Sequence, residues 1–378
     1  MDKITEALDR GEPADVVFLD FAKAFDKVPV ARLLERVKAH GIRGNVLRWI
    51  RSWLTDRQQR VVLNGNFSEW MAVLSGVPQG SVLGPLLFII FINDLDEEIP
   101  GGVMVSKFAD DTKVARTVAA EEGRAELQEA PRKLELWAAR WGMEFNILKC
   151  KVMHFGRNNP RHDYTMNGRL LEKTEEERDL GVVTMASTKP AAQCAKAAQT
   201  AQAVLGQIAR AFHFRDKEIF LGLYRQYIRP HLEFSVQAWA PWCQRDKDML
   251  ENVQRRAVKM ISGLRGDSYE ERLKELGLTS LEERRHRADM ALMHSVMHGR
   301  TDICVDEWFT RADTRARATR AATGALNVVP RHGRLEIRKN FFTVRATSNW
   351  NSVPSEVKQV ESANGFKMAY AKHREQNN

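Results

Sequence analysis

The feature that most constrains the fold is a pair of short β-type runs, each of which ends in acidic residues. Asp20 follows four apolar residues that are typical of a strand buried on both faces. Asp110 and Asp111 follow the run Val103 to Phe108, and a further β-capable stretch, 113–115, comes directly after them. This second pattern is typical of two strands joined by an acidic turn. A carboxylate at the end of a buried strand needs a reason beyond packing, so these acids are candidate functional residues.

Either acidic site taken alone is also typical of a turn aspartate that caps backbone N–H groups. Taken together, Asp20, Asp110 and Asp111 favour another interpretation, in which three carboxylates meet at the tips of neighbouring strands. Each pair at about 5 Å would repel by roughly 3 kcal/mol at an effective dielectric of about 20. Protons or hard cations must offset that repulsion, and oxygen ligands without a nearby His or Cys favour Mg²⁺ or Mn²⁺. Two such ions would suit phosphoryl transfer to a hydroxyl group.

A third motif, S-G-V-P-Q-G-S at residues 75–81, precedes an apolar run. Gly76 and Gly80 let the backbone approach a bulky partner, and Gln79 is left as an exposed amide. No Lys-Ser/Thr pair follows Gly80, so the motif is not the phosphate-binding glycine loop of nucleotide-hydrolysing enzymes. By itself it is equally typical of a glycine-rich loop before a buried helix.

The chain divides into two styles of sequence near residue 185. Before that point β-branched and aromatic runs alternate with helical periods, and after Ser187 the periods are helical, with breaks at Pro230 and Pro241. We therefore expect an α+β fold, a mixed domain followed by a helical region. The predicted strands are 16–21, 60–63, 69–74, 103–108 and 152–155. The predicted helices are 32–40, 45–54, 81–95, 121–140, 191–213, 216–228 and 246–261, and hairpin turns are predicted at 64–66 and 166–169.

Charge is distributed unevenly between the two halves. Residues 1–150 carry 20 Lys and Arg against 22 Asp and Glu, a net charge of −2, and residues 151–378 carry 38 against 27, a net charge of +11. The basic half is a candidate surface for a polyanion, although solvated helix faces give the same composition. The arginine-rich stretch 311–320 is interpreted as a linker, a frayed helix or an arm that contacts phosphates.

Cysteine spacing and hydropathy narrow the class of protein. The four cysteines form no C-x-x-C pair, so the sequence indicates neither a zinc ribbon nor a disulfide framework, which suits a reducing compartment. His294 and His298 lie one helical turn apart with Cys304 nearby, an incomplete zinc pattern without a fourth ligand. The longest apolar run, 82–95, contains Asn93 and Asp94 and is too short to span a bilayer. We expect an intracellular protein with no membrane partner.

Three ordered motifs now resemble one family. F-L-D-F-A-K-A-F-D at 18–26, S-G-V-P-Q-G-S-V-L-G-P-L-L-F at 75–88 and F-A-D-D-T at 108–112 are similar to the reverse transcriptases of non-LTR retrotransposons, most of all the jockey-type LINE elements of animals. The likeness continues through 141–156 and, more loosely, at 179–182 and 350–354. It implies a right-hand polymerase palm, a ferredoxin-like antiparallel sheet with helices, followed by a mostly helical thumb and a C-terminal region.

The resemblance also implies domain boundaries. The palm would occupy residues 1–160, the thumb and connecting helical region 161–265, and the basic C-terminal region 266–378. Only 19 residues precede Asp20, whereas the family has a fingers subdomain there. The fingers are therefore expected to be largely missing from a chain truncated at its N-terminus.

Roles for single residues follow from the resemblance. Two Mg²⁺ or Mn²⁺ ions would be held by Asp20, Asp110, Asp111 and the backbone carbonyl of Phe21. The bulky side chain of Phe25 would exclude a ribose 2′-hydroxyl and so select deoxynucleotides. The templating base and incoming nucleotide would be bordered by Gly76, Gln79 and Gly80. Lys149 would donate a proton to pyrophosphate, with Lys151 as the alternative.

The implied function is RNA-directed DNA polymerisation, in which dNTPs are added to a DNA primer or target DNA on an RNA template. The alternative is a catalytically weak or inactive remnant that binds RNA through its basic half. Exposed arginines expected to contact phosphates there are Arg255, Arg256, Arg284 and Arg285. The family's mode of integration implies the nucleus, with the cytoplasm as the alternative location. The sequence does not determine the oligomeric state or the RNA that is copied.

Overall fold

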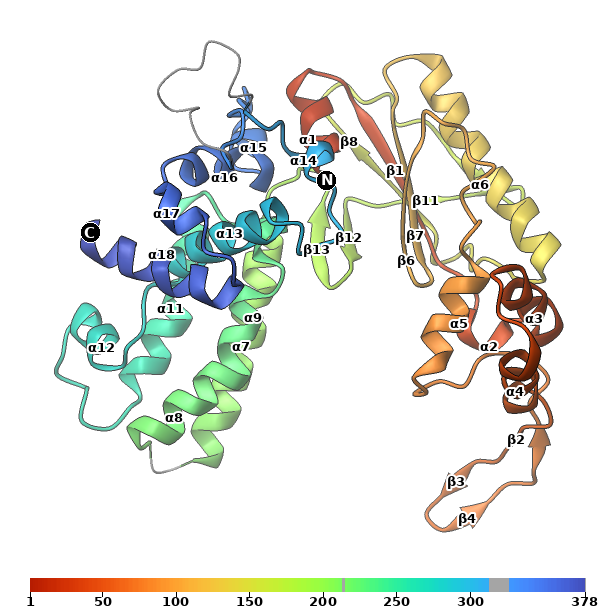
Figure 1. Ribbon diagram of the computed structural model, residues 1–378, viewed down its shortest axis with the longest axis horizontal. Coiled ribbons are helices and arrows are strands. Elements are labelled where there is room, and N and C mark those ends of the chain that lie inside the picture. The colour runs from red at the N-terminus through yellow and green to blue at the C-terminus, as the bar shows by residue number, and fades with distance from the viewer. Residues whose placement is uncertain (213–214, 313–325, 378) are drawn as a thin grey trace. The chain divides into compact units, whose positions relative to one another are not determined.

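The computed structural model describes residues 1–212, 215–312 and 326–377, and the chain forms two units (Figure 1). One unit is Gly11–Glu175, and the other combines Met1–Arg10 with Glu176–Asn378. The helix predicted to reach residue 213 is described as far as Ala211. Most of the arginine-rich stretch 311–320 lies outside the described residues.

A five-stranded sheet forms the centre of the first unit, in the order β11-β8-β1-β7-β6. Its strands are β1 (Ala14–Leu19), β6 (Met104–Phe108), β7 (Asp111–Thr117), β8 (Lys151–Phe155) and β11 (Glu172–Lys173). The central strand β1 pairs antiparallel with both β7 and β8. Its central position explains the apolar run before Asp20, because side chains on both faces of β1 are buried. Val16 is 2% exposed, and Val17, on the other face, is 0% exposed.

Five helices accompany the sheet. They are α2 (Ala24–Lys27), α3 (Val30–Ala39), α4 (Gly44–Leu54), α5 (Leu83–Phe91) and α6 (Glu121–Trp141). In Figure 1, α6 runs beside the sheet, and α2, α3, α4 and α5 lie together near the end at which β1 finishes. One hydrophobic core joins them, with Val17 and Leu19 of β1 packed in the same cluster as Leu33, Phe88 and Leu134. The helix predicted for 81–95 is shorter than expected, since α5 ends at Phe91.

Both predicted hairpin turns are confirmed. A two-stranded ribbon projects from the first unit (Figure 1), in which β2 (Gln58–Gln59) pairs with β5 (Met71–Ala72) and β3 (Val62–Leu63) with β4 (Asn66–Phe67). Its tip is Asn64-Gly65, with φ of 49° and 81°, the left-handed pair that such tight turns require. The second turn joins β9 (Thr165–Met166) to β10 (Arg169–Leu170).

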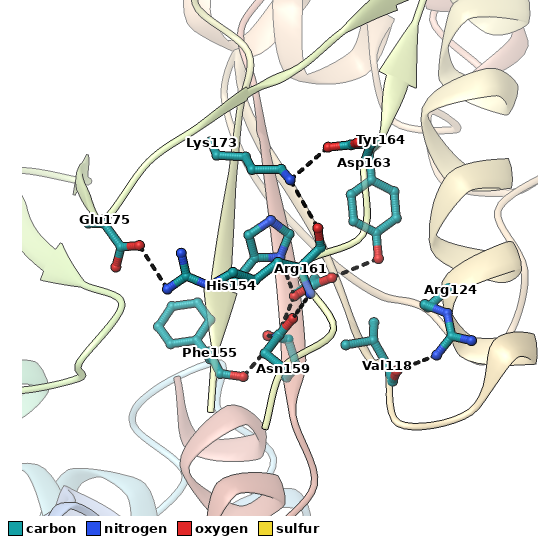
Figure 2. Close-up of polar contacts among 12 residues, drawn as sticks. Val118, Arg124, His154, Phe155, Asn159, Arg161, Asp163, Tyr164, Lys173 and Glu175 are labelled. Carbon is teal, nitrogen blue, oxygen red and sulfur yellow. Dashed lines mark hydrogen bonds and ion pairs between the residues drawn. The ribbon is translucent and has the colours of Figure 1, made fainter. Parts of the chain in front are cut away.

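A buried polar cluster fixes β8 and the loop after it to the first half of β1 (Figure 2). The Asp15 carboxylate is fully buried and accepts hydrogen bonds from His154 Nδ1 at 2.7 Å, Asn159 Nδ2 at 2.7 Å and Tyr164 Oη at 2.8 Å. Three donors around one carboxylate satisfy a group that would otherwise be costly to bury. Burial and the Asp15 charge raise the pKa of the Tyr164 hydroxyl well above its ordinary value, so that it remains a donor.

The second unit is mostly helical, as predicted for the second half of the chain. A short β-hairpin, β12 (Glu176–Asp179) and β13 (Val182–Met185), precedes the helices. The longer helices are α1 (Asp2–Asp9), α7 (Ala191–Ala211), α11 (Gln244–Lys259), α13 (Leu281–Met297), α16 (Phe342–Asn351) and α18 (Ala363–Asn377). The shorter ones are α8 (Lys217–Leu223), the π-helix η1 (Tyr224–Ile228), α9 (Arg229–Glu233), α10 (Val236–Trp239), α12 (Tyr269–Glu275), α14 (Val305–Trp308), α15 (Glu336–Lys339) and α17 (Ser355–Lys358).

Two hydrophobic clusters stabilise this unit. One is built around α7 and α11 and includes Leu205 and Leu250. The other is built around α13, α16 and α18 and includes Met293, Trp350 and Phe366. Within the described part of the chain, no helix has the length and apolarity needed to cross a membrane.

The histidine pair of α13 has a structural role in this second cluster. His294 Nε2 lies 2.7 Å from the carbonyl oxygen of Val360, and His298 Nε2 lies 2.8 Å from that of Lys358. Each ring donates a proton to a backbone carbonyl, so the two histidines tie α13 to the chain around α17. In the residues that the structure describes, this pair belongs to no group of three or more side chains that could hold a metal ion, so the zinc pattern stays incomplete there.

Candidate active site

The backbone register brings the three acids to one end of the central sheet. Pairing of β1 with β7 runs to Leu19 and Thr112, so the next residue on each strand is Asp20 and Asp111. Asp110 lies in the turn between β6 and β7. Directly opposed residues of antiparallel strands have Cα atoms about 4.5–5.5 Å apart. Residues ninety positions apart in sequence therefore end as neighbours.

The segment before β8 joins the same end of the sheet. Phe21 forms an isolated bridge with Phe145, and their rings stack at 4.1 Å. The Asn146 amide donates to the Asp20 carbonyl oxygen at 2.8 Å. Phe21, whose carbonyl was predicted to bind metal, thus has its side chain in the core and its backbone at the acidic end.

Of the two lysines predicted as proton donors, Lys149 lies beside the acids. Its Nζ is 3.2 Å from Asp20 Oδ2, and its side chain is mostly exposed. Lys151 instead pairs with Glu172 at 2.7 Å. Between them, Cys150 is buried, and burial raises the pKa of its thiol to about 11, so the thiol stays neutral. Of the two lysines, Lys149 is therefore the one that lies at the acidic end of the sheet.

The acidic end has the donor chemistry of a hard cation site. Asp20 Oδ2 is buried and accepts no hydrogen bond, and carboxylate oxygens are the ligands that Mg²⁺ and Mn²⁺ prefer. In the described ranges, however, no group of three or more His, Cys, Asp or Glu side chains is arranged to hold a metal ion. Lys149 supplies the positive charge next to Asp20. The residues fit a divalent cation in kind and backbone position, and the side chains would have to turn towards it.

The predicted sugar-selecting residue, Phe25, lies on α2. Its half-buried ring stacks on the fully buried ring of Phe88 in α5, with centroids 4.5 Å apart. This contact covers one face of the Phe25 ring and leaves part of the side chain exposed. The stacking on Phe88 therefore restricts the orientation of the Phe25 ring.

The glycine-rich loop runs along the Phe25 segment. The amides of Gly76 and Val77 donate to the carbonyl oxygens of Val28 and Phe25, both at 2.8 Å. Gly76 has a φ of 85°, and a Cβ there would lie 2.7 Å from the Cα of Asp26. A glycine is needed at 76 for close approach as well as for backbone conformation. Gly80 also has a positive φ of 78°, but a Cβ there would meet no atom within 4 Å.

Two residues around this loop had no role assigned from the sequence. Asp26 accepts a hydrogen bond from Gln79 Nε2 at 2.8 Å. The Arg57 guanidinium donates to the carbonyl oxygens of Ser75 at 3.2 Å and Gly76 at 2.6 Å, and burial lowers its pKa. Asp26 is the last residue of the motif F-L-D-F-A-K-A-F-D, so the motif could have identified it as a candidate site residue. Arg57 stands in no motif, and only the fold shows its contact.

One prediction about the basic half is wrong. Arg255 and Arg256 are exposed as expected, but Arg285 is only 6% exposed and Arg284 pairs with Glu233 through two nitrogen atoms. Helix α13 packs one face into the core, which buries Arg285, and the ion pair with Glu233 occupies Arg284. Arg255 and Arg256 stay candidates for phosphate contacts.

A known protein family matches the part of the chain that contains these motifs. The family model described as reverse transcriptase (RNA-dependent DNA polymerase) matches residues 4–206, more than half of the chain. The chain belongs to the reverse transcriptase family. The matched region includes the whole of the central sheet and its acidic end.

Curated relatives of this reverse transcriptase chain are mobile-element proteins. It is 27% identical over 271 residues to the RNA-directed DNA polymerase from mobile element jockey of Drosophila funebris, an alignment covering 68% of this chain and 29% of the relative. It is 30% identical over 183 residues to the Pol polyprotein of the retrotransposable element R2 of Popillia japonica, covering 43% and 29%. The chain thus spans about 29% of the length of these relatives.

A solved structure of telomerase from Candida albicans, in complex with a fragment of telomeric RNA, is also similar. The match covers 73% of this chain and 51% of that chain, with a TM-score of 0.38 and 12% identity. A likeness at this level carries no conclusion about the activity of this chain.

Proposed function

We propose that this chain is the polymerising part of an RNA-directed DNA polymerase of a non-LTR retrotransposon. It would add dNTPs to a DNA primer on an RNA template. The observation that carries the proposal is the register of β1 and β7, which puts Asp20 beside the turn that holds Asp110 and Asp111. The chain belongs to the reverse transcriptase family, and its relatives are named RNA-directed DNA polymerases. In such a chain, binding of divalent cations would offset the mutual repulsion of the three carboxylates.

Each polar group at the acidic end then has a task. Asp20, Asp110, Asp111 and the Phe21 carbonyl would hold two Mg²⁺ or Mn²⁺ ions. Such ions, when bound, activate a primer 3′-hydroxyl and stabilise the leaving pyrophosphate. Lys149 moves from the Asp20 carboxylate to the pyrophosphate and gives it a proton. Phe25 stands against the sugar and excludes a 2′-hydroxyl.

Nucleic acid binding in this proposal belongs to both units. Gly76, Gln79 and Gly80 border the templating base and the incoming dNTP. The exposed Arg255 and Arg256 of α11 contact phosphates of the primer and template, so binding weakens as salt rises. A nuclear location, where target DNA is found, belongs to the same proposal.

The deciding experiment is primer extension on an RNA template with the Asp110→Asn variant. The substitution keeps the shape of the side chain but removes its charge, so Mg²⁺-dependent cDNA synthesis should fall at least about 100-fold. Asp163→Asn is the matched control, because Asp163 is an exposed aspartate of the same unit that pairs with Lys173. RNA binding, measured by filter retention, should be unchanged in both variants. Tight RNA binding without any synthesis by the unmodified chain would favour the RNA-binding remnant instead.

A further inference from the structure

Asp26 and Gln79 form a hydrogen bond that stability does not explain. Both residues are exposed, and Gln79 Nε2 donates to Asp26 Oδ1 at 2.8 Å. A bond between two exposed side chains competes with water and immobilises both, so its net contribution to folding is small. The loop is already attached by the backbone bonds of Gly76 and Val77 and by Ser75 Oγ, which donates to the Asp26 carbonyl oxygen at 2.8 Å.

The bond does determine how the Gln79 amide faces. An ionised carboxylate only accepts hydrogen bonds, so Gln79 must turn its NH₂ group towards Asp26. The amide oxygen, Oε1, then points away from Asp26. A free glutamine side chain would rotate between both orientations, whereas this one presents an acceptor in one direction.

Phe25 lies next to Asp26, so the segment that contacts the Gln79 amide also positions the Phe25 ring. Phe25 stacks on Phe88, and its carbonyl oxygen accepts from Val77. The loop is also held by Arg57, which donates to the carbonyl oxygens of Ser75 and Gly76. The Phe25 ring and the Gln79 amide are therefore placed relative to each other by residues 25–28, and Asp26 is the member of that segment that contacts the amide.

We infer that Asp26 is a positioning residue for nucleotide binding, which fixes Gln79 so that its amide oxygen accepts a hydrogen bond from the incoming dNTP. Asp26 itself touches no nucleotide. It has this role only if the chain binds dNTPs, as proposed above. Removing Asp26 frees the amide to rotate, so nucleotide affinity falls while affinity for the nucleic acid duplex does not.

The test measures binding of a fluorescent dNTP to the chain on an RNA–DNA duplex whose primer ends in a dideoxynucleotide. Chemistry is blocked in this complex, so a chain that binds but does not polymerise still gives a result. Asp26→Ala should weaken dNTP binding about tenfold, the effect of one lost hydrogen bond. Asp26→Asn keeps an acceptor oxygen at the same place and should stay within about threefold of the unmodified chain.

Coupling distinguishes positioning from a general structural effect. The double variant Asp26→Ala, Gln79→Ala should bind dNTP no worse than Gln79→Ala alone, because both changes remove the same contact. Duplex affinity should be unchanged in Asp26→Ala and Asp26→Asn, and Asp163→Ala controls for loss of an exposed carboxylate.

Four outcomes overturn the inference: full dNTP affinity in Asp26→Ala, multiplied effects in the double variant, an equal loss of duplex affinity, or no dNTP binding by the unmodified chain. The coupled pattern together with no extension of an ordinary primer would support the role of Asp26 and overturn polymerase activity.

Discussion

Lys358 is a buried lysine whose charge is costly to the fold. It is 3% exposed, and its Nζ donates to Asn327 Oδ1 at 2.7 Å and to the Asn351 carbonyl oxygen at 3.1 Å. The Trp350 ring lies 5.6 Å away. In the described ranges no acidic side chain pairs with Lys358, and burial lowers its pKa from 10.5 to about 8.

This lowered pKa predicts a pH dependence of the free energy of unfolding. Between about pH 8 and 10.5 the unfolded chain keeps the Lys358 proton while the folded chain has lost it, so stability rises with pH in that window. Relative to Lys358→Met, the unmodified chain should gain on the order of 2 kcal/mol from pH 7 to 10.5. Urea denaturation at several pH values measures this difference. The exposed Lys367→Met is the control, and an identical pH profile for both variants would contradict the assignment.

Individual acids show why contacts matter more than residue type. Asp15 and Asp20 are five residues apart in and after the same strand, yet three donors enclose Asp15, whereas Asp20 Oδ2 is paired with the mostly exposed Lys149. The first arrangement satisfies the carboxylate charge within the fold. In the second, a bound cation could take the place of the exposed lysine.

At the scale of the element, the glycine-rich loop lies between β5 and α5 and is hydrogen-bonded to residues 25–28. Its two glycines share a positive φ but not their surroundings, because only Gly76 lies against the backbone of Asp26. At Gly80 a side chain would meet only an unfavourable backbone conformation, whereas at Gly76 it would also collide with neighbouring atoms.

This difference predicts unequal effects of the same substitution. Gly80→Ala should lower the free energy of unfolding by about 1 kcal/mol, the cost of a left-handed alanine. Gly76→Ala adds a Cβ 2.7 Å from backbone atoms and should cost about 2 kcal/mol more, because the loop must move away from residues 25–28. Thermal unfolding measures both variants. Equal losses would show that the loop is not pressed against the Asp26 backbone.

At the scale of the whole molecule, the first ten residues belong with the last two hundred. Helix α1 packs against α15, and Asp2 Oδ1 accepts from the buried Arg338 guanidinium at 2.6 Å. Arg338 also donates to Thr5 Oγ1 at 3.1 Å. The N-terminal helix thus closes the unit formed by Glu176–Asn378, although the next residue along the chain begins the other unit.

Loss of this contact should destabilise the C-terminal unit. Asp2→Ala leaves the Arg338 charge buried without its carboxylate, a change that costs about 3 kcal/mol. Lys3→Ala, one residue away and exposed, should change stability by less than about 0.5 kcal/mol. Hydrogen exchange of the amides in α15 and α16 reports the effect where it occurs. Unchanged exchange in Asp2→Ala would mean that α1 contributes nothing to that unit.

Local pattern was enough to predict most elements. Strand β1, both hairpin turns and helices such as α7 and α11 follow from β-branched runs, Asn-Gly pairs and helical periods, because these depend on neighbouring residues. Element ends were less certain, and α5 ends four residues before the predicted boundary. Helix α1 was not predicted, since its burial depends on residues more than three hundred positions away. The division at 160 and 265 stays a prediction.

By itself the sequence determined which residue types stand at the ends of strands and in which order the three motifs occur. This order was enough to identify the reverse transcriptase family. Only the tertiary structure decided which groups meet: Lys149 rather than Lys151 beside Asp20, Gln79 on Asp26, and Arg285 in the interior. The physical reason is range. Propensity and periodicity act between near neighbours, whereas a contact between distant residues depends on sheet register and packing, which the whole chain fixes together.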